Sequence, residues 1–324
     1  LTDMRSADGG FYAAYDADSE GEEGKYYVWT PEEVGALLDD DQFALLARKY
    51  GLDKAANFEG NWHLTVRDTV DDPDGLIDRA LASLLAARQQ RVAPGRDDKQ
   101  LTSWNALAIR GMAIAGRVLE REDLTDAAAT ACEFIRRELV VAGRLLASYK
   151  DGQARFPAYL DDHAFLLDAI LELLQSRWDS SQLAFAISLA DLLLEYFEDK
   201  DNGGFFFTAN DHESLMHRPK PFADEAVPSG NGIAALALQR LGHLIGEHRY
   251  IDAGERALRS AWQAVDEYPH GHVTLITALE EYLAPPEYIV IRGDQDTIAE
   301  WQDKLARLYA PTRLVFAIPG DAQD

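Results

Sequence analysis

The stretch at residues 97–116, DDKQLTSWNALAIRGMAIAG, is the clearest indication of the fold, because it joins a polar start to a long run of small residues. Trp104 and Asn105 stand where the run begins, and alanine, glycine, isoleucine and methionine make up most of its length. A helix that is apolar on nearly all sides is typical of a buried position. The stretch therefore predicts an inner helix with unusual polar and aromatic groups at its amino end.

Buried and amphipathic helices alternate along most of the chain. The segment at 228–246 repeats the small-residue character of 101–121, whereas 123–140 and 248–266 have one charged and one apolar face. Such alternation predicts helical hairpins, with the inner helices side by side around a central cavity. Helical periodicity places the helices near 73–92, 101–121, 123–140, 161–177, 180–197, 228–246, 248–266 and 272–284.

We therefore predict a mainly α fold, an (α/α)6 toroid that is incomplete at its N-terminus or an open arc, because only about four inner helices are found. The echo between Gly9-Gly10-Phe11 and Gly203-Gly204-Phe205 predicts short β-hairpins in the loops. After Ala284, a strand, a helix near 295–309 and a second strand form a β-α-β pattern. The predicted domains are the partial toroid, 1–284, and the C-terminal segment, 285–324.

Charge and composition limit the partners. The formal net charge of −25 disfavours nucleic acid and anionic lipid, and no run of about 18 apolar residues is present to span a membrane. The first residues lack the basic start and the apolar stretch of a signal peptide. Because Leu1 lies within a sequence pattern rather than at its beginning, we expect that the true N-terminus is missing. Cys132 lies in a helical pattern and is predicted to be a core residue. These features favour a soluble, cytoplasmic chain.

Parallel inner helices bring their amino ends together at one end of the cavity. Capping accounts for hydroxyls and carboxylates at these ends, but the aromatic, amide and imidazole groups in the first turns exceed what capping requires. Free N–H groups at helix ends suit hydroxyls, carboxylates or phosphate, so we predict a site for a sugar or polyol. Its predicted binding residues are Asp16, Asp18, Trp104, Asn105, His163, Arg218, Lys220, Ser229, Asn231 and His272.

Carboxylates near these ends provide the predicted chemistry. Asp98, Asp162 and Glu225 are the candidate catalytic residues, since glycosidic cleavage uses two carboxyl groups and epimerisation uses a proton donor and an acceptor. Asp161, Asp162 and His163 are consecutive and would not converge on a metal, and 16–24 lacks the spacing of a calcium-binding loop. No metal and no cofactor are predicted.

Four segments resemble, in the same order, the C-terminal region of the YyaL-type family, also described as spermatogenesis-associated thioredoxin-like proteins. The resemblance implies a toroid similar to six-hairpin glycosidases and N-acylglucosamine 2-epimerase. It also implies that a thioredoxin-like domain and the first hairpins precede these residues in a complete member. His163 stands where the family usually has an aromatic residue. The segments are GGFYAAYDADSEGEEGKYYVWTPEEV, DDKQLTSWNALAIRGMAIAG, AYLDDHAFLLDAILELL and RPKPFADEAVPSGNGIAALAL.

Three functions remain open on the sequence alone. The first is a carbohydrate-active enzyme of the epimerase, isomerase or glycoside-hydrolase class, with Trp104 as a stacking platform. The second is a non-catalytic module that binds a ligand or client protein for the thioredoxin-like domain. The third is a structural scaffold whose helix ends are filled by their own side chains. The helix ends carry more polar groups than capping requires, which favours the enzyme. Similarity of fold does not by itself establish a function.

Overall fold

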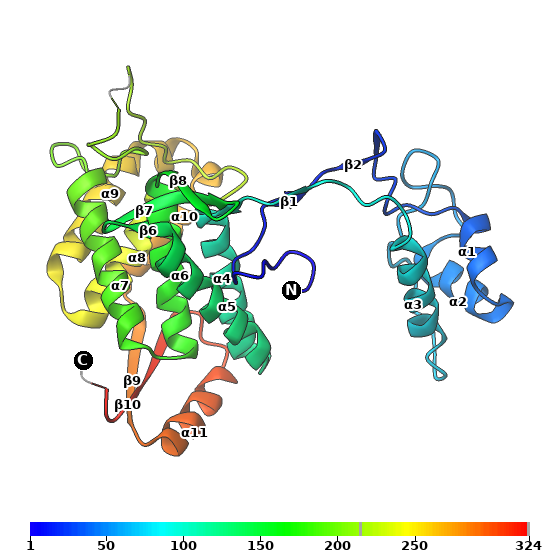
Figure 1. Ribbon diagram of the computed structural model, residues 1–324. Helices are drawn as coiled ribbons and strands as arrows, with labels where there is room; N and C mark the ends of the chain where they lie inside the picture. The colour runs from blue at the N-terminus through cyan, green and yellow to red at the C-terminus, as the bar shows by residue number, and fades with distance from the viewer. Residues whose placement is uncertain (214–215, 323–324) are drawn as a thin grey trace. The chain divides into compact units, whose positions relative to one another are not determined.

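The computed structural model describes residues 1–213 and 216–322, without the side chains of Gln295 and Asp303. Its contacts define two compact units, one of residues 14–97 and one of residues 1–13 together with 98–324 (Figure 1). Each unit has its own hydrophobic core, and each is described by itself. The compact units divide the chain elsewhere than at 284/285, and a domain boundary there stays a prediction.

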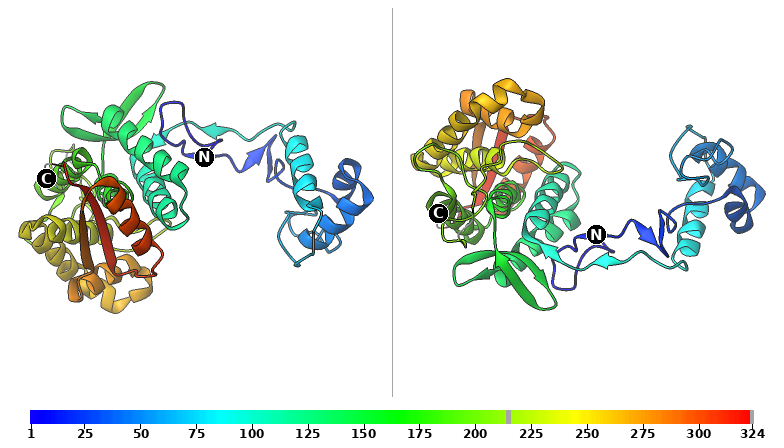
Figure 2. Two further views of the ribbon diagram at one scale, coloured as in Figure 1. Left: turned by 90° about the horizontal axis from the view of Figure 1, so that it is seen from below. Right: turned by 90° about the horizontal axis from the view of Figure 1, so that it is seen from above.

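The larger unit is an arc of helical hairpins, which Figure 2 shows close to end-on. Four inner helices pack side by side in chain order, and each of the first three is followed by an outer helix that packs against it. The predicted arrangement, a partial (α/α) toroid, is confirmed. The inner helices are α4 (Thr102–Val118), α6 (Leu160–Ser176), α8 (Gly230–Ile245) and α10 (Val273–Leu283), and the outer ones are α5 (Glu122–Phe134), α7 (Ser180–Leu192) and α9 (His248–Glu267).

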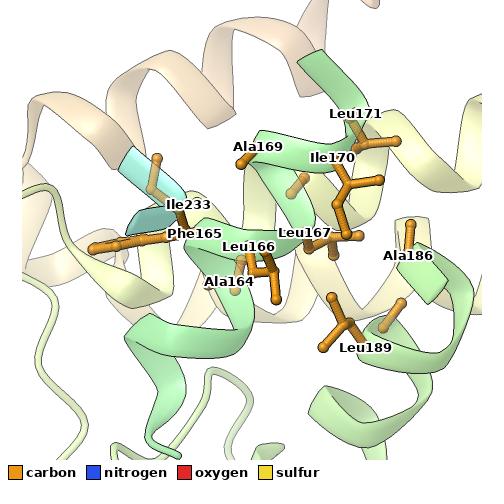
Figure 3. Packing of buried hydrophobic residues seen from close by; sticks show 14 of the residues in the cluster. Ala164, Phe165, Leu166, Leu167, Ala169, Ile170, Leu171, Ala186, Leu189 and Ile233 are labelled. Carbon is orange, nitrogen blue, oxygen red and sulfur yellow. The ribbon is translucent and has the colours of Figure 1, made fainter. Parts of the chain in front are cut away.

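Burial follows from these positions. Helix α6 has neighbours on several sides and buries all of its residues except Asp161 and Ser176. Figure 3 shows Phe165, Leu167 and other α6 side chains packed with α7 and α8. Outer helix α9 instead buries one stripe, Tyr250, Ala253, Gly254, Ala257, Leu258, Ala261 and Val265, and faces water on the other side. Helix α6 is apolar on nearly all sides because other elements surround it, whereas α9 is apolar only on the side that packs against the protein.

Strands lie beyond both ends of the inner helices (Figure 1). At one end β7 (Arg144–Lys150) pairs with β8 (Gln153–Pro157) and with the short strands β5 (Gln100–Leu101) and β6 (Val140–Val141). At the other end β9 (Glu287–Gly293), α11 (Gln295–Ala306) and β10 (Arg313–Pro319) form the predicted β-α-β segment, with β9 and β10 parallel. The β7–β8 hairpin was not predicted from the sequence.

The C-terminal segment is bonded to the carboxyl end of α6 through one residue, Gln175. The Val315 backbone N–H donates to Oε1 of Gln175, and the Gln302 amide donates to the Gln175 carbonyl. Phe316 in β10 is 1% exposed and belongs to the core of the larger unit. The segment is therefore packed onto the arc rather than separate from it.

The smaller unit has three helices, α1 (Pro31–Leu37), α2 (Asp40–Tyr50) and α3 (Leu76–Arg88), around a core that includes Trp29 and Leu46. Two short antiparallel pairs join β1 (Ala14–Tyr15) to β4 (Arg96–Asp97) and β2 (Asp18–Ser19) to β3 (Glu22–Glu23). Capping boxes begin α1 at Thr30 and α2 at Asp39. Sequence periodicity predicted α3 but missed α1 and α2.

Cys132 is 1% exposed in α5, and burial raises the pKa of its thiol to about 12. The prediction of a core cysteine is confirmed. Within the part of the chain that the structure describes, no helix has both the length and the apolar character that a membrane span requires.

Two glycines of α4 give a test of how closely the helices pack. A Cβ on Gly116 would lie 2.3 Å from Oγ1 of Thr125 in α5, whereas a Cβ on Gly111 would meet nothing within 4 Å. We expect Gly116→Ala to lower the free energy of unfolding by about 1–3 kcal/mol, because the helices must separate. Gly111→Ala should raise it by up to about 1 kcal/mol through helix propensity. Urea denaturation measures both, and equal effects would contradict close α4–α5 packing.

Candidate functional site at the amino ends of the inner helices

Asp162 joins the amino ends of α4 and α6. Its Oδ1 accepts a hydrogen bond from the Ser103 backbone N–H at 2.9 Å, and its Oδ2 accepts one from the Tyr159 N–H at 2.8 Å. Both donors are amides that the helices cannot satisfy themselves. The buried carboxylate of Asp162 therefore caps the amino end of α6 and links it to the amino end of α4.

Asp224 makes the same kind of brace between α8 and α10. Its two oxygens accept from the backbone N–H groups of Ser229 and Thr274, each at 2.8 Å. Burial opposes ionisation of Asp224, but the hydrogen bonds from Thr274 and Ser229 outweigh it and hold the pKa below its usual value. Ser229 also caps α8 through its hydroxyl, which accepts from Gly232 at 3.3 Å. The predicted catalytic residue Glu225, next in sequence, is exposed on the loop.

Asn105 and Asn231 explain the echo between the two Gly-Gly-Phe segments. Oδ1 of Asn105 accepts from the Phe11 N–H at 2.7 Å, and its amide donates to the Phe11 carbonyl at 3.0 Å. Asn231 makes the equivalent pair with Phe205, at 2.7 and 2.9 Å. Each amide also donates to a second carbonyl. Both side chains thus hold a loop backbone against an inner helix, and a role in ligand binding stays a prediction.

The two predicted histidines also bond to backbone. Nδ1 of His163 lies 2.9 Å from the Tyr159 carbonyl, and Nδ1 of His272 lies 2.7 Å from the Tyr268 carbonyl. A carbonyl only accepts, so each Nδ1 donates. Burial lowers the pKa of His163 to about 4, which keeps this imidazole neutral. Its buried Nε2 has no partner among the described residues.

The predicted basic residues stabilise the loop that precedes α8. Lys220 donates to Oδ2 of Asp199 at 2.7 Å and to a backbone carbonyl at 3.0 Å. Arg218 donates to the Thr208 carbonyl, and its guanidinium lies over the ring of Phe206 with 4.1 Å to the centroid. Lys220 is thus paired with a carboxylate, whereas the buried Nε of Arg218 has no hydrogen-bond partner among the described residues.

The remaining predicted carboxylates lie on loops and short strands. Asp98 is half-buried between β4 and β5. Asp16 and Asp18 belong to the smaller unit, where both are exposed and Oδ1 of Asp16 accepts from the Asp18 N–H at 3.2 Å. Participation of these three residues in a site with the helix ends stays a prediction.

Asp161 and Trp104 keep groups suited to a ligand, and together with the braced Asp162 we call them the amino-end cluster. Burial raises the pKa of Asp161 to about 6, and it raises that of Asp162 to about 7 against the hydrogen bonds from Tyr159 and Ser103. Trp104, which follows Ser103 in α4, is 47% exposed. Carboxyl groups that titrate near neutral pH can give and take protons there.

Asp161 faces the start of the neighbouring helix α8. A Cβ on Gly230 would lie 2.1 Å from Oδ1 of Asp161, so only glycine allows this approach. No hydrogen bond to Asp161 is found among the described residues, which distinguishes it from its braced neighbour Asp162. The sequence showed the pair of acids but not which of them would be braced. The described residues contain no group of three or more metal-ligating side chains placed to hold an ion.

Comparisons with known proteins agree with the resemblance found in the sequence motifs. No family model matches the chain. Spermatogenesis-associated protein 20 from Rattus norvegicus is 31% identical over 363 residues, which cover 97% of this chain and 46% of the relative. The chain thus spans about half the length of the curated relatives it matches.

Two solved structures have similar folds. A GH76 α-mannanase from Bacteroides thetaiotaomicron aligns with a TM-score of 0.47 and 10% identity, over 76% of this chain and 74% of the mannanase. Cellobiose 2-epimerase from Bacillus thermoamylovorans aligns with a TM-score of 0.45 and 11% identity, over 86% and 81% of the two chains.

Replacement of Asn231 tests the loop anchor. Asn231→Ala removes three hydrogen bonds and leaves the buried Phe205 N–H without an acceptor, so the free energy of unfolding should fall by about 3 kcal/mol. Asn210→Ala is the control, because Asn210 is exposed and its amide donates to the Glu195 carbonyl at the surface. Urea unfolding of both variants measures the difference, and a loss below about 1 kcal/mol for Asn231→Ala would refute the anchor.

Asp161→Asn tests the raised pKa of Asp161. A folded-state pKa above the unfolded value means that folding favours the protonated acid, so the wild type loses stability as pH rises from about 4 to 7. The asparagine cannot ionise. The variant should therefore match the wild type near pH 4 and exceed it by about 2–3 kcal/mol at pH 8. Urea unfolding at several pH values gives the difference, and a constant difference across this range would contradict the shift.

Proposed function

Because the chain is a homologue of spermatogenesis-associated protein 20 over 97% of its own length, we propose a function for the helical module that the two share. The module binds and transforms a sugar or related polyol at the amino ends of its inner helices. The reaction belongs to the epimerase, isomerase or glycoside-hydrolase class.

The observation that carries this proposal is the pair of neighbouring carboxyl groups, Asp161 and Asp162, whose pKa values of about 6 and 7 lie close to neutral. Proton transfer to or from a substrate is fastest when the pKa of the acid or base lies near the working pH. Both proposed reaction classes need such a group, since a glycosidic oxygen must be protonated on leaving and an epimerised carbon must lose and regain a proton.

The two acids have different proposed roles. Asp162 uses both oxygens on backbone donors of α4 and α6, so its main role is to position the helix ends. Asp161 has no described hydrogen bond and is the proposed proton carrier. Asp98 and Glu225, which lie on loops, are the candidates for the second carboxylate of the reaction.

Trp104 is the proposed binding platform. Nearly half of this large side chain is exposed at the start of α4, one residue after the Ser103 amide that Asp162 holds. An indole face fits the apolar C–H face of a sugar ring, and its burial by a ligand would release a large contact area from water. The brace on Ser103 keeps the backbone beneath this side chain in place.

A non-catalytic module that binds a ligand or client for a thioredoxin-like domain is the second candidate. It is favoured by the way most predicted binding side chains are used. Asn105, His163, Lys220, Asn231 and His272 all bond to the protein itself. Such a module would bind a sugar or peptide through Trp104 without converting it.

Incubation of the protein with mono- and disaccharides in D2O tests the proposal, with proton NMR to detect deuterium at an epimerised carbon or a new reducing end. Asp161→Asn should lower kcat at least about 100-fold, because proton transfer by a positioned acid contributes about that much. Trp104→Ala should mainly raise KM, by about tenfold, through the loss of stacking.

Trp262→Ala is the matched control, because Trp262 lies on α9 and is 53% exposed, close to the 47% of Trp104. It should leave both constants unchanged. Sugar binding without turnover would replace the enzyme proposal by the binding module. Neither binding nor turnover of any saccharide at millimolar concentration would refute the enzyme proposal and leave the module only a peptide or client protein as its ligand.

A further inference from the structure

A buried network of charges crosses all four inner helices, away from their amino ends. Arg240 in α8 holds Glu281 in α10 with two hydrogen bonds of 2.6 and 2.9 Å, and its third nitrogen lies 3.3 Å from Oε1 of Glu172 in α6. The surrounding carboxylates raise the pKa of Arg240 despite its burial. Buried charges of this kind persist only when they are paired.

Two arginines of α4 complete the network. Nε of Arg110 donates to Oδ2 of Asp168 at 2.6 Å, and Arg117 donates to Oε2 of Glu172 at 2.9 Å and to its carbonyl at 3.1 Å. The Asp168 side chain is only 1% exposed, whereas that of Arg110 is 36% exposed. Arg110 therefore pairs with the core through one edge and presents its other edge outward.

This outward side faces a cavity of about 510 Å³ between the inner helices and the C-terminal segment. Arg110, Arg117 and Arg240 line one wall, together with Glu172. Helix α11, the turn after it and β10 supply the opposite wall, which includes Leu305 and Arg313. A volume of this size is within the range of small-molecule sites.

Arginine is the predominant charged residue of the cavity lining, and each of these arginines has a carboxylate partner. Five arginines line the cavity, among them Arg307 and Arg313, whereas Glu172 is the only carboxylate of the described lining residues. The chain as a whole has a formal net charge of −25. Arginine is the side chain best suited to carboxylate and phosphate, because its planar N–H groups match both.

Two of these guanidinium groups keep unused donors. Arg110 bonds Asp168 through Nε, and Arg313 bonds Glu287 through Nε at 2.6 Å. Among the described residues, no acceptor is found for the terminal nitrogens of either side chain. These nitrogens are therefore available to a ligand in the cavity.

We propose that this cavity binds a small organic anion through its carboxylate or phosphate group. Arg110 and Arg313 hold the anionic oxygens from opposite walls, and Ile114, Leu305 and Leu314 pack against the body of the ligand. The site is separate in sequence and chemistry from the amino-end cluster, and it does not depend on turnover of a sugar there.

Isothermal titration with glucose 6-phosphate, glucuronate and phenyl phosphate tests this site, with glucose and benzyl alcohol as neutral counterparts. At least one anion should bind about tenfold or more tightly than its neutral counterpart, since charge-assisted hydrogen bonds are the stronger ones. Glucose 6-phosphate against glucuronate separates phosphate from carboxylate recognition.

Three variants locate the binding. Arg313→Gln should raise the Kd about tenfold, and its loss of the half-exposed Glu287 partner should cost the fold little. Arg110→Lys keeps a charge for Asp168 but removes the free edge, and should weaken binding to a similar extent. Ala306→Trp should abolish binding by filling the cavity, which Ala306 lines.

Arg259→Gln is the control, because Arg259 forms a comparable surface pair with Glu255 on α9, outside the cavity lining. It should leave the Kd unchanged. Equal binding of the neutral probes, an unchanged Kd in Arg313→Gln or Ala306→Trp, or no binding of any anion would each overturn the proposal. The Arg313→Gln, Arg110→Lys and Ala306→Trp variants leave Asp161 and Trp104 unchanged, so binding that these variants weaken belongs to the cavity and not to the amino-end cluster.

Discussion

The arc depends on one repeated interaction, a carboxylate that accepts backbone N–H groups from the amino ends of two neighbouring inner helices. Asp162 makes it between α4 and α6, and Asp224 makes it between α8 and α10. Helix ends leave amides unsatisfied, and burial makes an unsatisfied amide costly. Sharing one carboxylate between two helices removes that cost and fixes their spacing at the same time. The loop anchors at Asn105 and Asn231 then build on helices already held in place.

Most of the polar groups that made the helix ends look like a binding site serve this construction. The amides and histidines bond to loop backbone, and the two basic residues bond to the loop before α8. Within the described part of the chain, two side chains at the helix ends, Asp161 and Trp104, do not take part in holding the helices and loops together. Asp161 has a raised pKa and no described partner, and Trp104 is half exposed beside the brace.

Charged residues inside the inner helices form a separate network of ion pairs. Arg110, Asp168 and Arg240 each interrupt an apolar run, and the helical period puts Arg110 and Arg117 on one face of α4. These charges are visible in the sequence, and a charge buried within a helix of small residues needs a partner of opposite charge. The sequence does not say which helix supplies the partner, and so the network and its cavity emerge only when four helices are placed side by side.

Residue patterning alone was enough to predict the hairpin arc, the order of inner and outer helices and the C-terminal β-α-β segment, because enclosure dictates apolar patterning along each helix. It missed α1, α2 and the β7–β8 hairpin. Tertiary contacts settled the use of those polar groups that bond to distant segments. Asp161 and Asp162 are chemically identical neighbours, and the bond from the Ser103 N–H in α4 makes Asp162 the brace between two helices. Hydrogen bonds between segments far apart in the chain depend on where those segments meet, which no local pattern of residues encodes.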